Sequence, residues 1–497
     1  MPRTKIAVIG SGVGGLAAAC DLARQDLDVV VLERASAPGG KIRQVTVDNV
    51  GIDAGPTVFT MRWIFESLFE DCGATLSDRL GLNRADILAR HAWLQGGTLD
   101  LFADIERSAD AIGVFAGPAE AKGFREFCAR SADIFATLKD TFIAAPRPSP
   151  VQLVRRVGFS NLGAMWRTAP FQTMWSALGQ HFRDPRLRQL FGRYSTYCGA
   201  SPLAAPATLM LIAYVEQEGV WLVDGGINAV AKALQSLAED QGASFRFDAE
   251  VEEIMVENGG VAGVRLADGE RISADAVIFN GDVAALGGGM LGRSVARAAR
   301  ATPAEKRSLS AITWCRHAHT RGFNLHHHNV FFAEDYPREF RTIFDTHDIT
   351  EAPTVYVCAQ DRGSGDRDFS NVSERLLLLV NAPANGDERH YDEIAVANLW
   401  DRVSSLLKDC GLEIEDSSPG IVTTPTDFNH LFPATGGALY GRANHGSMAS
   451  FDRQGASTRI DGLYLAGGSV HPGPGIPMAA MSGRLAAAQL ISDQQSR

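Results

Sequence analysis

The feature that most constrains this chain is the segment KIAVIGSGVGGLAAACDLARQDLDVVVLE at residues 5–33. An apolar, β-branched run at residues 6–9 leads into the glycine-rich sequence GSGVGG at residues 10–15. Helix-forming residues follow, and a second apolar run at residues 29–32 ends at Glu33. In this order the first glycine makes a tight turn, the second lets backbone approach a ligand, and the third packs helix on strand. The segment therefore predicts a strand, a turn, a helix and a parallel strand.

The same segment predicts where a dinucleotide binds. Phosphates are stabilised at the start of a helix, because free N–H groups and the positive end of the helix dipole face them there. Glu33 follows the last glycine at about the spacing at which a carboxylate binds ribose hydroxyls. An ordinary glycine-rich turn would not combine both strands, the helix and the acid. We therefore expect a Rossmann-like α/β domain with a nucleotide cofactor.

Residues 221–283 have a second pattern of this kind. Gly225 and Gly226 precede an amphipathic helix, and short alternating strands with glycine-containing turns follow. The segment ends in an apolar strand that runs into residues 280–282. The pattern predicts a helix, a β-meander and one more strand.

The segment LYLAGGSVHPGPGIPMAAMSG, residues 463–483, predicts a further strand, glycine turn and helix. We expect the helix over residues 479–488. Small residues in the turn let the backbone lie directly against a ligand, with the helix start facing it. His471 is the ionisable side chain of this loop, and we interpret it as a packed or turn-stabilising residue rather than a catalytic one.

The composition limits the remaining classes of function. At 497 residues the chain is long enough for two or three domains, and 45% apolar with 21% charged residues is a globular composition. The net charge of −11 leaves no basic excess for binding nucleic acid. The seven cysteines are scattered, without a C-x-x-C pair, as is usual in a reducing compartment.

No membrane-spanning segment or signal peptide is expected. The apolar runs at residues 209–215 and 376–380 are shorter than the roughly 18 residues that a spanning helix needs. The first 23 residues share some features with a lipoprotein signal. The same residues satisfy the more demanding dinucleotide pattern, which we prefer.

Four patches carry a resemblance to a known family. RASAPGGKIR at residues 34–43 and GIDAGPTVFTM at residues 51–61 resemble the flavin amine oxidase and carotenoid desaturase superfamily. HHHNVFFAEDYPREF at residues 326–340 and GLYLAGGSVHPGPGIPM at residues 462–478 resemble the bacterial phytoene desaturase-type carotenoid desaturases. The resemblance covers nearly the whole chain and is weakest at residues 100–215. It is closest to the 1-hydroxycarotenoid 3,4-desaturases, also called hydroxyneurosporene or methoxyneurosporene dehydrogenases.

The resemblance implies that the cofactor is FAD, which accepts hydride at its N5 atom while the protein supplies position and electrostatics. Val251 would lie behind the adenine, and N–H groups at the start of the last helix would stabilise reduced flavin. No catalytic side chain is implied. The usual family sequence THPGAGIPG is replaced here by SVHPGPGIPM at residues 469–478. The residues implied to contact FAD are Gly10, Ser11, Gly12, Gly14, Gly15, Glu33, Arg34, Gly40, Lys41, Gly55, Pro56, Thr57, Val58, Val251, Gly467, Gly468, Ile476, Pro477 and Met478.

The resemblance also implies an α/β architecture with an FAD-binding domain of the flavin amine oxidase and glutathione reductase type. An inserted mixed-sheet substrate domain and a helical subdomain would complete it. The implied limits are residues 1–75, 221–290 and 441–497 for the discontinuous FAD-binding domain, 76–100 and 291–440 for the substrate-binding domain, and 101–220 for the helical subdomain.

The substrate implied by the resemblance is an acyclic 1-hydroxycarotenoid, which would gain a C-3,4 double bond by losing hydride to the flavin and a proton to water or a weak base. Quinone or oxygen would reoxidise the cofactor. A lipophilic substrate implies peripheral contact with the cytoplasmic side of a membrane, within carotenoid biosynthesis of photosynthetic organisms.

Residues 146–182 have the composition of such a membrane contact, since basic side chains alternate with apolar ones. Ordinary amphipathic helices of an internal domain explain the same pattern. The side chains concerned are Arg155, Arg156, Phe159, Trp166, Arg167, Phe171, Met174 and Trp175.

Five histidines within residues 315–328, CRHAHTRGFNLHHH, raise the question of a metal site. Adjacent histidines on a strand point to opposite faces, so we expect no metal there. Three other functions stay open. They are a phytoene-type desaturase or isomerase of the same family, a flavin amine oxidase with an aromatic cage that we cannot locate, and a non-enzymatic binding protein like the GDP-dissociation inhibitors.

Overall fold

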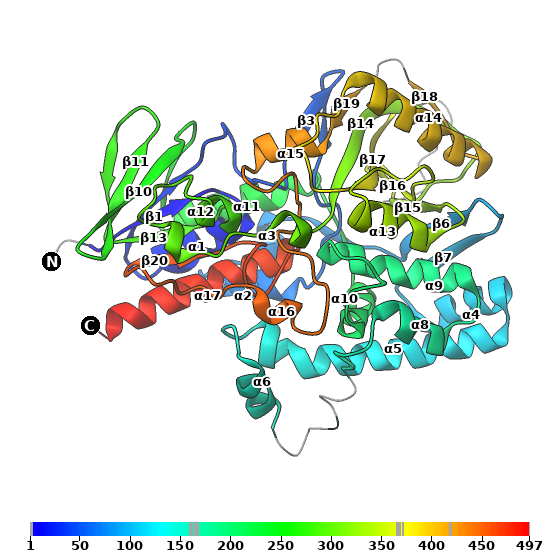
Figure 1. The fold of residues 1–497 in the computed structure, drawn as a ribbon, viewed down its shortest axis with the longest axis horizontal. Coiled ribbons are helices and arrows are strands. Elements are labelled where there is room, and N and C mark those ends of the chain that lie inside the picture. The colour runs from blue at the N-terminus through cyan, green and yellow to red at the C-terminus, as the bar shows by residue number, and fades with distance from the viewer. Residues whose placement is uncertain are drawn as a thin grey trace.

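The computed structural model describes residues 3–158, 163, 168–363, 369, 372–416 and 420–496. In Figure 1 a parallel sheet and its helices lie at the left, and a larger mixed sheet lies at the right. A group of helices lies below the mixed sheet, with α5 (Pro118–Leu138) along the lower edge. The α/β architecture predicted from the sequence is confirmed.

The parallel sheet contains the predicted strand–turn–helix–strand unit at its centre. Its five strands follow the order β20-β13-β1-β2-β9 and all neighbours are parallel. They come from three distant parts of the chain, so long-range packing and not a local hairpin forms the sheet. The strands are β1 (Lys5–Ile9), β2 (Asp28–Leu32), β9 (Ser244–Arg246), β13 (Ala276–Phe279) and β20 (Leu463–Leu465).

The helix α1 (Val13–Ala23) is buried along its whole length, which explains why it is built almost entirely of small and apolar residues. The last helix, α17 (Ile476–Gln495), packs against it at very short range. A Cβ atom on Gly483 would overlap the carbonyl oxygen of Gly14, so only glycine fits there. The other covering helices are α2 (Trp63–Asp71) and α11 (Asn228–Asp240).

The helix α17 is longer than the sequence predicted. We expected residues 479–488, whereas the helix begins at Ile476 and ends at Gln495. Pro477 lies in the first turn, where proline lacks only an N–H that would have no helical partner. The earlier start places the helix terminus inside the glycine-rich loop.

Beside the parallel sheet lies the predicted β-meander. It consists of the antiparallel strands β10 (Val251–Glu257), β11 (Gly260–Leu266) and β12 (Arg271–Ser273). The chain then enters β13 and the short helix α12 (Val283–Gly287).

The mixed sheet has the order β18-β14-β17-β16-β15-β6-β7, with β19 also paired to β14. Its central strands are buried on both faces, and β15 and β16 have no exposed residue. The strands are β6 (Ile87–Trp93), β7 (Thr98–Phe102), β14 (Ser310–Arg321), β15 (His328–Phe332), β16 (Val355–Ala359), β17 (Glu374–Ala382), β18 (Glu413–Asp416) and β19 (Ile421–Thr423). Its helices are α13 (Tyr336–Asp345), α14 (Glu393–Asp409) and α15 (Pro425–Leu431).

The remaining helices lie mostly between residues 105 and 218. Those in this range are α4 (Ile105–Ala116), α5, the π-helix η1 (Lys139–Ile143), α6 (Pro150–Val157), α8 (Met174–His181), α9 (Pro185–Gly192), the 3₁₀-helices η3 (Arg193–Cys198) and η4 (Ala207–Met210), and α10 (Leu211–Glu218). Short helices outside it are α3 (Leu76–Arg79), η5 (Ala296–Ala298), η6 (Ala304–Lys306) and α16 (Ala449–Asp452). There are also two small antiparallel pairs of strands. One is the hairpin of β3 (Gln44–Val47) and β4 (Val50–Asp53), and the other joins β5 (Leu82–Arg84) to the distant β8 (Trp221–Val223). Within the part of the chain that is described, no helix is both long and apolar enough to cross a bilayer.

The predicted membrane-contact residues do not all reach the surface. Met174 is fully buried, and Trp175 packs under the guanidinium of Arg188 at 4.7 Å from its ring centre. One face of α8, with Met174, Ala177 and Leu178, is therefore interior, because this helix packs against α5 and α9. Phe159, Trp166 and Arg167 lie outside the described residues.

The close packing of α1 and α17 gives a stability prediction. We expect Gly483→Ala to lower the free energy of unfolding by about 1–3 kcal/mol, because the new methyl group overpacks the contact with Gly14. The matched control is Gly113→Ala in α4, where the new Cβ meets Ala121 at an ordinary 3.5 Å. That control should be neutral or slightly stabilising. Urea unfolding followed by circular dichroism measures the free energy of unfolding of both variants. If Gly483→Ala unfolds with the free energy of the wild type, the two helices are not packed this closely.

Candidate active site

One cavity of about 1290 Å³ lies between the parallel sheet, the mixed sheet and the helices. The residues predicted to contact the cofactor all line it except Ser11 and Gly15, which lie just behind its wall. Segments from the beginning, middle and end of the chain thus share one surface.

The turn at the start of α1 forms the first part of the wall. Gly10 has a φ angle of +95°, which favours glycine, and its carbonyl oxygen accepts a hydrogen bond from Asn280 Nδ2 at 3.1 Å. A Cβ atom on Gly15 would overlap the Gly10 carbonyl. The first N–H groups of α1 have no partner within the helix, so they are available to a ligand in the cavity.

Glu33 directly follows β2 beside this turn, and its carboxylate accepts three hydrogen bonds. Oε2 accepts from the backbone N–H of Ser11 at 2.7 Å and from its hydroxyl at 2.9 Å, and Oε1 accepts from the Ala35 N–H at 2.9 Å. Glu33 is buried yet lines the cavity. Ser11 therefore positions the carboxylate from behind the wall.

Arg34, Lys41 and Gly55 continue the same wall. Arg34 donates to the carbonyl oxygens of His430 and Leu431, whereas Lys41 Nζ donates to the carbonyl of Leu439 at 2.6 Å. Burial lowers the pKa of Lys41. A Cβ atom on Gly55 would overlap the Lys41 carbonyl, so the backbone of residues 55–58 lies directly on the segment that follows Gly40.

The glycine-rich loop before α17 closes the wall from the other side. Gly467 and Gly475 both have positive φ angles, of +106° and +112°, and Gly475 is the N-cap of α17. The helix thus begins at the cavity, as the interpretation of this loop required. The His471 side chain points away from the cavity, since its Nε2 lies 2.8 Å from the Ala145 carbonyl oxygen. Burial lowers the pKa of His471 to about 4.

We call the part of the wall formed by the segments around Gly10, Glu33, Gly55 and Gly467 the cradle. Beyond the cradle the wall becomes apolar. Side chains of η1, α6, α10 and β17 line this end, and they are Phe142, Ile143, Leu153, Leu211, Ile212, Val215, Leu377 and Leu379. Such a surface suits a long hydrocarbon ligand lying next to the glycine-rich cradle.

The model of the flavin containing amine oxidoreductases matches residues 13–491. The chain belongs to this family.

Individual relatives agree with this assignment. Hydroxyneurosporene desaturase of Rubrivivax gelatinosus is 52% identical over 495 residues, which cover 99% of this chain and 94% of the relative. The protein of the same name from Rhodobacter capsulatus is 40% identical over 498 residues and 99% of each chain.

Solved structures of low identity share the fold. A triple mutant of putrescine oxidase has a TM-score of 0.61 at 14% identity, covering 100% of this chain and 99% of that one. A fatty acid isomerase from P. acnes has a TM-score of 0.58 at 10% identity, covering 98% of both.

The protein is therefore an FAD-dependent oxidoreductase. Two structural features of the cavity fit this cofactor. Glycines occupy wall positions where a Cβ atom would overlap neighbouring atoms, and the helices α1 and α17 both begin at the cavity. Anionic groups are stabilised at such helix starts. We assign the phosphates to the start of α1, the ribose to Glu33 and the flavin end to the start of α17.

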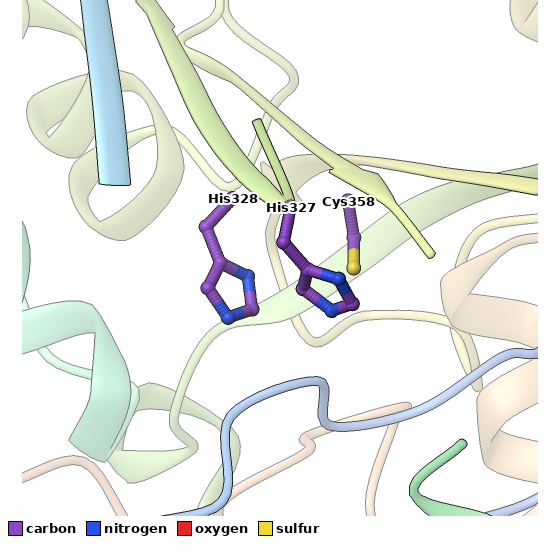
Figure 2. A group of neighbouring side chains, drawn as sticks. All are labelled: His327, His328 and Cys358. Carbon is purple, nitrogen blue, oxygen red and sulfur yellow. The ribbon is translucent and has the colours of Figure 1, made fainter. Parts of the chain in front are cut away.

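The expectation that these histidines bind no metal stays a prediction, and the strand argument behind it does not hold for His327 and His328. His327 precedes β15, so strand alternation does not separate it from His328, and the two rings lie 4.6 Å apart between centroids. Figure 2 shows both rings and the thiol of Cys358 in one group. Their Nδ1 atoms already contact oxygen, that of His327 at the Arg362 carbonyl (2.8 Å) and that of His328 at the Tyr356 hydroxyl (2.7 Å).

A group of polar residues in the cavity wall was missed entirely by sequence reasoning. It consists of Arg193, Tyr197, Glu216, Tyr336 and Tyr356, which come from four different elements. No spacing in the sequence connects them, since only tertiary folding brings them to one wall.

The assignment of the phosphates to α1 gives a second prediction. Gly12→Val should weaken FAD retention by about two orders of magnitude, because the new Cβ atom would meet Asn280 Nδ2 at 3.0 Å and displace the turn at the start of α1. The flavin-to-protein absorbance ratio after desalting measures this without any activity assay. A variant that keeps the normal flavin content, with unfolding as in the wild type, would contradict the placement.

Proposed function

We propose that this protein is an FAD-dependent carotenoid desaturase, which introduces a C-3,4 double bond into acyclic 1-hydroxycarotenoids. The observation that carries the proposal is a single cavity in which a dinucleotide cradle continues into a long apolar wall. Relatives named hydroxyneurosporene desaturase, 40–52% identical over nearly the full length, support the substrate class.

The chain contributes orientation and exclusion of water. Leu211, Ile212 and Val215 on α10 form a smooth apolar surface along which a polyene lies extended. Bound FAD supplies the acceptor for the hydride that leaves carbon. Holding the reacting carbons beside the cradle converts a bimolecular encounter into an intramolecular one. We assign no side chain as proton acceptor, because a polyene delocalises positive charge and water or a weak base suffices.

The assay that tests this proposal offers holoenzyme several acyclic carotenoids in liposomes. We expect 1-hydroxyneurosporene or its methoxy relative to be desaturated with a kcat/KM about a hundredfold above that of phytoene, because the reaction requires an already conjugated chain near C-3. The product absorbs at longer wavelength and is identified by its spectrum. Parallel incubations with quinone without oxygen, and with oxygen alone, identify the electron acceptor. Desaturation of phytoene with no action on the hydroxylated substrate would refute the proposal.

The substrate class also supports peripheral membrane contact through two exposed apolar side chains, Val151 on α6 and Phe171 before α8. Val151 is 79% exposed and Phe171 is 80% exposed, although both are apolar. Arg155 and Arg156 lie in the last turn of α6, and Leu153 of the same helix lines the cavity. A lipid surface would take up such apolar side chains with basic groups beside them. The polyene would then enter the cavity from the bilayer at the cytoplasmic side.

A vesicle-binding experiment tests the membrane contact. The double variant Val151→Asp with Phe171→Asp should bind anionic liposomes about ten- to a hundredfold more weakly, because two apolar anchors become charged. The matched control is Ile394→Asp at the start of α14, which is 73% exposed and far from α6 in Figure 1. Sedimentation with vesicles measures both. Equal binding by the double variant and the wild type would place the membrane surface elsewhere.

A further inference from the structure

A second group of polar side chains lines the cavity outside the cofactor cradle. We call this group the polar chamber and define it as Arg193, Tyr197, Glu216, Tyr336 and Tyr356, all of which line the cavity. Arg193 and Tyr197 lie on η3, Glu216 on α10, Tyr336 at the start of α13 and Tyr356 on β16. Four separate elements thus deliver hydrogen-bonding groups to one spot.

The chamber is held rigid by its own contacts. Glu216 accepts a hydrogen bond from the Tyr197 hydroxyl at 2.5 Å and another from Tyr194 at 2.7 Å. The guanidinium of Arg193 lies over the rings of Tyr197 and Tyr356, at 5.5 and 5.3 Å from their centres. A charge in an apolar wall costs free energy that hydrophobic side chains of similar size would not. Stability alone therefore does not explain the chamber.

The chamber contains a hydroxyl without a partner. The Tyr336 hydroxyl is buried and makes no hydrogen bond with any described residue, and the side chain is only 2% exposed. Its ring is fixed edge-to-face against Phe332 and Phe340, with centroids 5.8 and 4.9 Å away. Burial raises the pKa of Tyr336, with the Glu339 carboxylate adding to the rise, so the phenol stays protonated. Leaving such a group unsatisfied costs about 1–3 kcal/mol.

The chamber adjoins the cofactor cradle. The Tyr356 hydroxyl lies 2.6 Å from the hydroxyl of Thr57, which belongs to the cradle segment at residues 55–58. On its other side it contacts His328 Nδ1 at 2.7 Å. A ligand group bound in the chamber would therefore lie close to the cradle segment at residues 55–58.

We infer that the polar chamber binds the tertiary hydroxyl of the substrate, with Arg193 and Tyr336 as its direct partners. This inference rests on the proposed function. A hydroxyl group carries one donor and acceptor lone pairs, which match the N–H donors of Arg193 and the free phenol of Tyr336. In a 1-hydroxycarotenoid the hydroxyl-bearing carbon is two bonds from C-3. An anchor for the hydroxyl must then lie beside the cradle, as the chamber does. The apolar wall takes the rest of the chain.

Tyr336→Phe is the sharpest test, because it removes only the unpartnered hydroxyl and breaks no hydrogen bond within the described protein. We expect the ratio of kcat/KM for a 1-hydroxycarotenoid over its non-hydroxylated analogue to fall about ten- to a hundredfold. The control is Tyr391→Phe, which removes a buried hydroxyl bonded to Asn385, outside the cavity. The control should keep the ratio of the wild type.

Arg193→Gln should lower the same ratio, and Arg193→Lys should restore part of it, because an ammonium also donates to a hydroxyl oxygen. The matched control is Arg188→Gln, which removes another guanidinium stacked on an aromatic ring but away from the cavity. Binding without turnover gives a second readout. Holoenzyme reduced with dithionite is titrated with each carotenoid, and quenching of tryptophan fluorescence reports the dissociation constants.

The outcomes separate the two proposals. If the wild type desaturates hydroxylated and non-hydroxylated substrates equally well, or if Tyr336→Phe lowers both equally, the chamber does not read the hydroxyl and the inference is overturned. If Arg193→Gln loses its flavin, the chamber serves the cofactor instead and the inference is again overturned. A wild type inactive on every acyclic carotenoid would overturn the proposed function, and the chamber's role with it.

Discussion

The contact between α1 and α17 is the constraint on which the rest of the structure depends. Gly14 and Gly483 meet so closely that neither position has room for a side chain. The Ser482 hydroxyl accepts a hydrogen bond from the Gly467 N–H at 3.2 Å, which ties the glycine-rich loop to the same helix. Because both helices begin at the cavity, their separation sets the distance between two sites of partial positive charge. A cofactor with phosphates at one end and a redox ring at the other requires that distance to be fixed.

The two ends of the cavity use opposite physical strategies. In the cradle, much of the wall is backbone that offers N–H groups at close range, and Glu33, Arg34 and Lys41 are among its charged side chains. At the substrate end, side chains of α10 and β17 provide a dry apolar surface. The polar chamber interrupts that surface beside Thr57. It contains the Tyr336 hydroxyl, which has no hydrogen-bond partner among the described residues, and the guanidinium of Arg193. A hydrogen bond from a ligand to these groups is stronger than the same bond in water, because the surroundings have a low dielectric constant and few other partners.

The sequence predicted the cradle well because its determinants are local. The turn at residues 10–15, the acid at Glu33 and the loop before α17 each lie within one contiguous pattern. The polar chamber could not be predicted, since Arg193, Glu216 and Tyr356 meet only through the packing of three elements. The prediction that His327 and His328 point to opposite faces was wrong for a similar reason. Whether neighbours on the chain share a face depends on where the strand begins, and β15 begins at His328 itself.

This division explains how one fold accommodates very different substrates. Putrescine oxidase and the fatty acid isomerase share the architecture at 14% and 10% identity, so most side chains outside a small set are free to change. Cradle glycines such as Gly15 and Gly55 have no room for a side chain, because a Cβ atom there would overlap a backbone carbonyl of the same wall. Side chains on α10, α13 and β16 are not bound by that limit, and they decide what lies beside the flavin end. The chamber lies on these elements and contacts the cradle through the Thr57 hydroxyl. Selectivity for a substrate can therefore change there without loss of the cofactor.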